Sequence, residues 1–272
     1  MGITTNAVMS SANAEWIAKN IDDINISFDG PRDIQDFQRP TRRDTGSFKT
    51  VCNSLDILKK NKKRFHFRGT ITDYSQDRMP EIVEFFSKFN PIGIQLEPMF
   101  ISTRSIKTDI KNPDDQAFVN GFIEAEKIAL KKNIRFRFSA FRFPIISKTF
   151  CGIGWKNIAI TPDGDVTSCF EVLHRSDSRS PIFFFGKYLE GNGYHFFKEK
   201  IDKLRQISKK QFKYCKNCIA KWHCAGDCRG KAFYLNDEEH FQGAGRCRII
   251  RALTKRKLIE LLHEGGESEN DK

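Results

Sequence analysis

The first 145 residues alternate between short apolar segments and longer segments whose apolar residues have helical spacing, with a repeat of roughly 35 residues. The short apolar segments predict strands at 25–28, 65–72, 92–97 and 134–138. Helical patterns lie between them at 12–20, 46–60, 79–89 and 113–132. Pro113, followed by Asp114 and Asp115, is typical of a helix start. Strands that alternate with helices through short connections predict a parallel α/β sheet, either open or closed into a barrel.

Segment 140–149 is predicted to separate this domain, residues 1–145, from a second domain at residues 146–264. In the second domain, residues 158–166 predict a β-hairpin with the turn Pro-Asp-Gly at its tip. Residues 136–143 alternate phenylalanine with mostly basic residues, which predicts a half-buried strand rather than a surface on which nucleic-acid bases stack. The acidic, polar segment 265–272 is expected to be a disordered tail.

Composition narrows the class of protein. A chain of 272 residues can form one large or two moderate domains. No apolar run reaches membrane-spanning length, and no basic segment followed by an apolar one marks the N-terminus, so a cytoplasmic protein without a membrane partner is expected. The net charge of +12 fits either acidic partners or a solvated basic surface. No nucleic-acid partner is expected.

The cysteines carry the clearest chemical signal. Seven of the eight lie after residue 150, in the order Cys151-x12-Gly164-x4-Cys169, then Cys215-x2-Cys218-x5-Cys224-x3-Cys228, and finally Cys247. Closely spaced cysteines allow one backbone segment to bind several corners of a metal centre, and distant ones complete the site. Seven thiolates exceed one tetrahedral site, so two centres are expected.

Three kinds of cysteine chemistry compete. Disulfides are disfavoured by the odd number of clustered cysteines and by the absence of an export signal. Zinc is a serious alternative, because four-cysteine sites with Cys-x-x-Cys pairs are common. The compact series from Cys215 to Cys228 favours iron–sulfur ligation. Cys52 lies beside apolar residues at helical spacing, which predicts a buried structural thiol.

The order of these cysteines resembles the SPASM domain, the auxiliary-cluster module of many radical S-adenosylmethionine (radical SAM) enzymes. Residues 224–228, Cys-Ala-Gly-Asp-Cys, look like its core motif. The first half also resembles the radical SAM family: residues 4–7, 26–31, 68–72 and 95–98 look like barrel strand ends, and 36–39 and 46–48 like the loop and helix start after the second of these. The resemblance implies an α/β fold, with a partial radical SAM (β/α) barrel containing the later strands only, followed by a small cysteine-rich α+β SPASM domain.

The resemblance also implies two auxiliary four-iron four-sulfur (4Fe-4S) clusters. The outer cluster would be held by Cys215, Cys218, Cys224 and Cys247. The inner cluster would be held by Cys151, Cys169 and Cys228, which leaves one iron open to substrate or another side chain. Sulfatase maturases carry an aspartate after the second cysteine, whereas this chain has Cys169-Phe170-Glu171, so peptide maturation other than formylglycine formation is expected.

Two further residues resemble positions that bind S-adenosylmethionine. A hydroxyl such as that of Ser27 can bind a ribose, and a guanidinium such as that of Arg39 can bind a carboxylate. An ordinary loop hydrogen bond is the alternative for both. His223, beside Cys224, either tunes a cluster through a hydrogen bond or has a packing role, and packing is the expectation.

The motif Cys-x3-Cys-x2-Cys, which defines the radical SAM family and should precede residues 4–7, is not in this sequence. The chain alone is therefore expected not to generate a radical, and S-adenosylmethionine is expected only in a complete enzyme. A fragment, a chain completed by an upstream radical SAM half, and a degenerate paralogue are the three explanations. The expected function is the C-terminal part of a radical SAM/SPASM enzyme with a peptide or protein substrate and an electron donor such as ferredoxin or flavodoxin. The alternative is a non-catalytic iron–sulfur electron-transfer or scaffold subunit.

Overall fold

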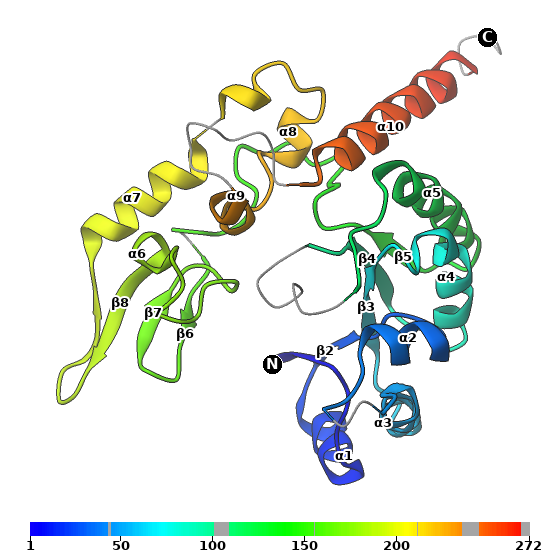
Figure 1. Cartoon of the computed structure of the whole chain (residues 1–272), viewed down its shortest axis with the longest axis horizontal. Helices are drawn as coiled ribbons and strands as arrows, with labels where there is room; N and C mark the ends of the chain where they lie inside the picture. The colour runs from blue at the N-terminus through cyan, green and yellow to red at the C-terminus, as the bar shows by residue number, and fades with distance from the viewer. Residues whose placement is uncertain (43–44, 101–108, 155, 211, 236–244, 268–272) are drawn as a thin grey trace. The chain divides into compact units, whose positions relative to one another are not determined.

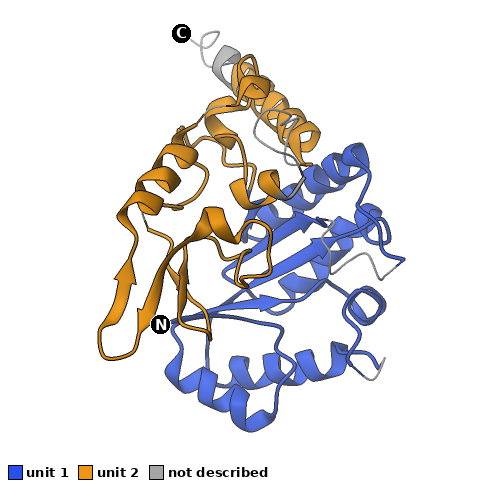
Figure 2. Ribbon diagram, turned by 60° about the vertical axis from the view of Figure 1, so that its left-hand side comes forward, with its two compact units in different colours: residues 1–139 blue, residues 140–272 orange. Residues whose placement is uncertain are grey.

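The computed structural model describes residues 1–42, 45–100, 109–154, 156–210, 212–235 and 245–267. The chain divides into two compact units, Met1–Ser139 and Ala140–Lys272 (Figure 2). This division falls at the first residue of segment 140–149, where the sequence changes from a strand–helix alternation to a cysteine-rich region. None of the described helices is both long enough and apolar enough to cross a membrane.

Unit 1 is built on a parallel sheet whose five strands lie in the order in which they occur along the chain (Figure 1). The strands are β1 (Gly2–Thr5), β2 (Asp23–Ser27), β3 (Phe65–Ile71), β4 (Gly93–Pro98) and β5 (Arg135–Arg137). The connecting helices are α1 (Ser11–Asn20), α2 (Arg32–Gln38), α3 (Phe48–Lys60), η1 (Gln76–Arg78), α4 (Met79–Ser87) and α5 (Asp115–Lys131). All four strands and all four helices predicted for this region are confirmed to within a few residues.

The two faces of this sheet differ in polarity. Alternate residues such as Ile26, Phe67 and Leu96 are completely buried. The strands follow one another in chain order, and right-handed crossovers then place every connecting helix on the same side of the sheet. The buried residues face these helices. Phe28 anchors this core, with ring centroids 5.5 to 6.5 Å from those of five other phenylalanines. Several of the intervening residues, including Arg68 and Gln95, are partly or fully exposed. A sheet with one apolar and one polar face is the expected wall of a partial barrel.

Local hydrogen bonds determine where the helices begin. The Asp114 carboxylate accepts from the backbone N–H groups of Gln116 and Ala117, so α5 begins after Asp114 rather than at Pro113. The Asp36 carboxylate accepts from the N–H of Phe48 at 2.7 Å and thereby caps α3. A Cβ on residue 46 would lie 2.2 Å from this carboxyl group, which explains why that position is glycine.

The prediction of one strand across residues 136–143 is wrong. Strand β5 ends at Arg137, and the backbone turns at 139–140. The physical reason is the buried carboxylate of Glu97, which accepts hydrogen bonds from the N–H of Ser139 at 2.8 Å and from its hydroxyl at 2.9 Å. These bonds draw the chain away from the direction of the strand.

Unit 2 contains an antiparallel sheet of consecutive strands, β6 (Ala159–Ile160), β7 (Asp165–Thr167), β8 (Phe184–Leu189) and β9 (Gly193–Phe196). The hairpin predicted at 158–166 is confirmed, with Ile160 opposite Val166. Gly164 adopts φ +76° at its turn and donates its N–H to the Thr161 carbonyl at 2.9 Å. This hairpin leads the chain directly to Cys169.

Helices make up much of the rest of the described part of unit 2, and some of them carry cysteines. They are α6 (Ser180–Phe183), α7 (Lys198–Lys209), η2 (Lys213–Cys215), α8 (Lys221–Cys224), α9 (Arg229–Leu235) and α10 (Cys247–Glu267). The main apolar cluster of this unit includes Val166, Phe183 and Leu204 together with Cys169. Helix α10 includes residues 265–267 of the segment expected to be a disordered tail, and residues 268–272 lie outside the described residues.

Candidate metal centres and strand-end site

Four cysteines line one pocket in unit 2. Cys215 ends η2, Cys218 lies in the turn that follows, Cys224 ends α8, and Cys247 begins α10. Ala220, Gly226 and Ile250 complete the apolar part of its wall. Lys221, Arg251 and Tyr214 also line it, so the other polar groups at its wall are mainly cationic. These are the four cysteines that the resemblance assigns to the outer cluster; iron binding by them remains a prediction.

The backbone of this segment turns tightly enough to bring the thiols together. The N–H of Cys218 donates to the Cys215 carbonyl at 3.3 Å, and the N–H of Cys224 donates to the Ala220 carbonyl at 2.7 Å. Burial, followed by the charges of Cys247 and Cys218, raises the pKa of Cys215 to about 11. Burial also raises the pKa of Cys224, with added contributions from Asp227 and Cys247. The thiolate forms therefore need a cation beside them, which a bound metal centre would supply.

A second group consists of Cys151, Cys169 and Cys228. Burial raises the pKa of Cys169 to about 12, and the nearby Cys228 and Cys151 contribute to the increase. Cys151 packs against the apolar cluster that contains Cys169. A Cβ on Gly230 would lie 2.9 Å from the Cys169 sulfur and 3.7 Å from the Cys228 sulfur. A glycine in the first turn of α9 therefore makes room for both sulfurs, and these are the three cysteines assigned to the inner cluster.

Neither group closes around a single ion. Among the described residues, no three His, Cys, Asp or Glu side chains come together closely enough to hold one metal ion. A tetrahedral zinc site would need ligand sulfurs about 4 Å apart, given zinc–sulfur bonds of about 2.3 Å. The four outer thiols line one pocket.

The other candidate residues of this region have different surroundings. His223 packs against the ring of Phe143, with centroids 4.7 Å apart, and its Nδ1 lies 3.1 Å from the Ile145 carbonyl oxygen. Cys52 lies on α3 in unit 1, whereas the other seven cysteines belong to unit 2, and burial followed by the charge of Asp56 raises its pKa to about 11. Both placements fit packing roles.

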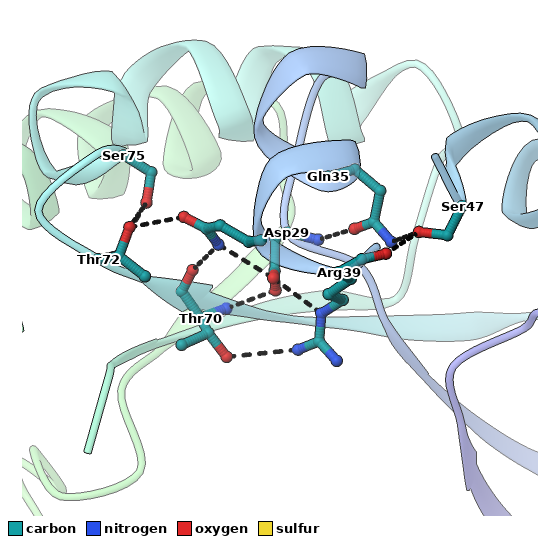
Figure 3. Close-up of polar contacts among 8 residues, drawn as sticks. Asp29, Gln35, Arg39, Ser47, Thr70, Thr72 and Ser75 are labelled. Atoms are coloured by element: carbon teal, nitrogen blue, oxygen red, sulfur yellow. Dashed lines mark hydrogen bonds and ion pairs between the residues drawn. The ribbon is translucent and has the colours of Figure 1, made fainter. Parts of the chain in front are cut away.

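In unit 1, polar residues meet at the carboxyl ends of β2 and β3, where ligands bind in parallel α/β folds (Figure 3). Asp29, only 1% exposed, is the centre of this network. Its carboxylate accepts from the N–H of Thr70 at 2.8 Å, from the Gln38 amide at 3.0 Å and from Arg39 Nε at 2.8 Å. Gln35 donates to the Ser47 hydroxyl, which in turn donates to the Arg39 carbonyl. The loop that carries Arg39 is therefore held firmly against the strand ends.

The two residues predicted to bind S-adenosylmethionine lie at this edge but have different partners. Arg39 also donates through Nη2 to the Thr70 hydroxyl at 3.4 Å, and its Nη1 bonds to no described residue. Ser27 ends β2, partly exposed, and its hydroxyl makes no hydrogen bond within the described residues. The structure thus brings both residues to one edge, and no contact joins them directly.

Sequence reasoning missed the residues that organise this edge. Asp29 and Thr70 were noticed only as parts of strand-end motifs, and Gln38 was not singled out. Glu97, 7% exposed, forms a further buried contact at the end of β4, where its carboxylate accepts from the Gln95 amide at 2.7 Å as well as from Ser139. The available signal was an acid or hydroxyl residue at the end of each predicted strand.

No model of a known protein family matches the chain. An uncharacterised protein of Methanothermobacter thermautotrophicus is 36% identical over 104 residues, which are 38% of this chain and 38% of that protein. The alignment therefore spans well under half of that relative.

Solved structures give a broader likeness. The structure of anSMEcpe with bound AdoMet superimposes with a TM-score of 0.73 and 15% identity, covering 98% of this chain and 75% of that one. SuiB of Streptococcus suis bound to S-adenosylmethionine gives a TM-score of 0.57 and 16% identity, covering 89% of this chain and 58% of that one. SuiB bound to its precursor peptide SuiA gives a TM-score of 0.58. Both are radical SAM enzymes, and the predicted fold is confirmed: this chain has their α/β architecture, a partial barrel followed by a cysteine-rich α+β unit.

Proposed function

We propose that this chain is part of a radical SAM enzyme that modifies a peptide or protein, and that unit 2 holds two auxiliary 4Fe-4S clusters. The observation that carries the proposal is that Cys215, Cys218, Cys224 and Cys247, which come from four separate turns and helix ends, line one pocket. Cys151, Cys169 and Cys228 would hold the second cluster. Such clusters supply electron transfer or a binding position for a substrate.

The strand-end site of unit 1 would bind part of S-adenosylmethionine in the complete enzyme. Arg39, whose guanidinium is oriented by Asp29 and Thr70, would donate to the carboxylate of the cofactor. The Ser27 hydroxyl, which makes no hydrogen bond to a described residue, would bond to the ribose of the cofactor. The AdoMet bound in anSMEcpe and SuiB supports this assignment of the cofactor site. The peptides bound in other structures of the same two enzymes support a peptide substrate.

The charge around the outer cysteines supports an acidic electron donor, such as a ferredoxin or flavodoxin. Residues 203–226 contain seven Lys and Arg residues and no Asp or Glu. Tyr214, Ile219 and Trp222 are exposed within the same segment. Cations that surround a few exposed apolar side chains would attract and orient an acidic partner.

Iron and acid-labile sulfide analysis of the anaerobically purified chain tests the proposal. About eight irons and eight sulfides per chain are expected if both clusters contain four irons. Stoichiometric zinc without sulfide would overturn it.

One observation favours the alternative of a non-catalytic iron–sulfur subunit: Cys52 is the only cysteine outside the two groups, so these 272 residues contain no third thiol triad. Incubation with dithionite and S-adenosylmethionine, with and without a candidate upstream chain, separates the two functions. Formation of 5′-deoxyadenosine only when that chain is added supports the enzyme. Its absence in both mixtures supports the subunit.

A further inference from the structure

One arginine of unit 2 joins the segments that carry the two cysteine groups. Arg142 donates five hydrogen bonds, all to backbone carbonyls. Two go to Thr149, both at 3.4 Å, and the others go to Phe150 at 2.8 Å, His223 at 3.2 Å and Cys224 at 3.3 Å. Phe150 directly precedes Cys151 of the inner group, whereas Cys224 belongs to the outer group. One rigid guanidinium therefore connects a cysteine segment of each group, and it also lies over the Phe150 ring at 4.9 Å.

The charge of Arg142 is not balanced by a carboxylate. Its hydrogen bonds to described residues all go to carbonyls, and none of the described carboxylates forms an ion pair with it. Burial lowers the pKa of Arg142, while the nearby Cys224, Asp227 and Cys151 act in the opposite direction. A half-buried cation without a counter-ion is unfavourable, and thiolate-ligated clusters, which are anionic, would remove that cost.

Arg229 also donates to backbone carbonyls and lies over an aromatic ring, and its side chain is more deeply buried than that of Arg142. It is 3% exposed, lies 4.2 Å from the ring centre of Phe212, and donates to the carbonyls of Ile207, Gly226 and Lys210. Its electrostatic neighbours include Cys215, Cys151 and Cys224, so it too faces both groups. Within the described residues neither guanidinium forms an ion pair with a carboxylate, although Asp227 lies near both, and thiols of both groups are among their electrostatic neighbours.

We propose that Arg142 is a positioning residue common to both clusters, which holds their cysteine segments together and provides positive charge that stabilises their reduced forms. The inference rests on the proposed function, because both cysteine groups must hold clusters. One-electron reduction by an added reductant gives a cluster one more negative charge, and a nearby cation makes this step more favourable. Loss of that charge should therefore make both midpoint potentials more negative.

The test compares R142Q, which removes the charge, with R142K, which keeps it but cannot reproduce the forked contacts. K203Q is the control, because Lys203 is exposed on α7 and makes no hydrogen bond or ion pair with a described residue. Iron and sulfide content, thermal stability and redox titration followed by electron paramagnetic resonance are measured for each loaded protein. R142Q should shift both potentials negative, and R142K should keep potentials near wild type but melt at a lower temperature. K203Q should change neither property.

The outcomes separate this inference from the proposed function. Wild-type protein without iron and sulfide would overturn both. Wild-type protein with two clusters whose potentials R142Q leaves unchanged, or changes in one cluster only, would overturn the shared role of Arg142. Iron retained in R142K but lost in R142Q would support the role of the charge. Iron lost from both variants would show a purely structural role and overturn the assignment of charge.

Discussion

Asp227 and Arg246 form an almost completely buried ion pair in unit 2, with exposed fractions of 1% and 4%. The Asp227 carboxylate accepts from Arg246 Nε at 3.1 Å and also from the N–H of Cys228 at 2.7 Å. Removing one charge from a buried pair loses the attraction that offset the desolvation of the other charge. We therefore expect D227N, which keeps the shape of the side chain, to lower the free energy of unfolding by about 3–5 kcal/mol in urea titrations.

The control for this prediction is D202N. Asp202 pairs with Arg205 at 3.1 Å, but both side chains are nearly half exposed, so the loss should stay below about 1 kcal/mol. Equal losses in the two variants would contradict the assigned role of burial.

Cys52 allows a test at high pH that does not involve the proposed clusters. Burial, followed by the charge of Asp56, raises its pKa to about 11, so at pH 8 only about one molecule in a thousand carries the thiolate. Alkylation by iodoacetamide should accelerate about tenfold per pH unit between pH 8 and 10, because only the thiolate reacts. Mass spectrometry of the Cys52 peptide measures the rate, with free cysteine as the reference. A plateau near pH 9 would rule out the raised pKa.

At the scale of elements, strong periodicity was a sufficient guide for β2 to β5 and for helices α1, α3, α4 and α5. The resemblance placed a loop at residues 36–39, whereas residues 36–38 end helix α2 (Arg32–Gln38). This helix is not predicted because seven largely polar residues after a proline carry too short a pattern. Arg142 was assigned to a strand, and its real position depends on the turn that Glu97 imposes at Ser139. Contacts between side chains far apart in the sequence, such as Gln38 with Thr70, leave no periodic signal.

The first turn of α9 gives a prediction about the inner group alone. In G230A the new methyl group would lie 2.9 Å from the Cys169 sulfur, so a sulfur must move. Iron content should fall from about eight to about four per chain, because the pocket of the outer group is not lined by Gly230. The control is G2A, where the nearest atom lies at an ordinary contact distance of 3.5 Å. Full iron content in G230A would contradict the placement of Cys169 and Cys228 beside this helix.

At the scale of the whole molecule, the two units differ in how their stability should depend on metal. Unit 1 has a core of many buried aliphatic and phenylalanine side chains beneath its sheet. The cysteine segments of unit 2 pack on smaller clusters. In one of these clusters, the buried residues among those described are Phe212 and Ala232. Removal of iron by a chelator should therefore loosen unit 2 selectively, since folding of such segments is coupled to metal binding.

Hydrogen exchange followed by mass spectrometry measures this effect. Amides of η2, α8 and α9 should exchange markedly faster after chelation, while those of β2, β3 and β4 should keep their rates. The C218A variant should show the same local increase without chelator, because one thiol of the outer group is missing. Uniform acceleration across both units would contradict separate stabilisation.

The consecutive strand order of unit 1 also has a consequence for synthesis of the protein. Each strand pairs with the strand before it, so no pairing has to wait for a distant part of the chain. On the ribosome, each emerging strand–helix pair can add to an edge that already exists, and the sheet can grow from β1 to β5 as translation proceeds. The cysteine groups cannot form in this stepwise manner, because the outer one needs Cys247. The scaffold can therefore fold before Cys247 leaves the ribosome, and under the proposed function the delivery of iron and sulfide would be a late step in the maturation of the chain.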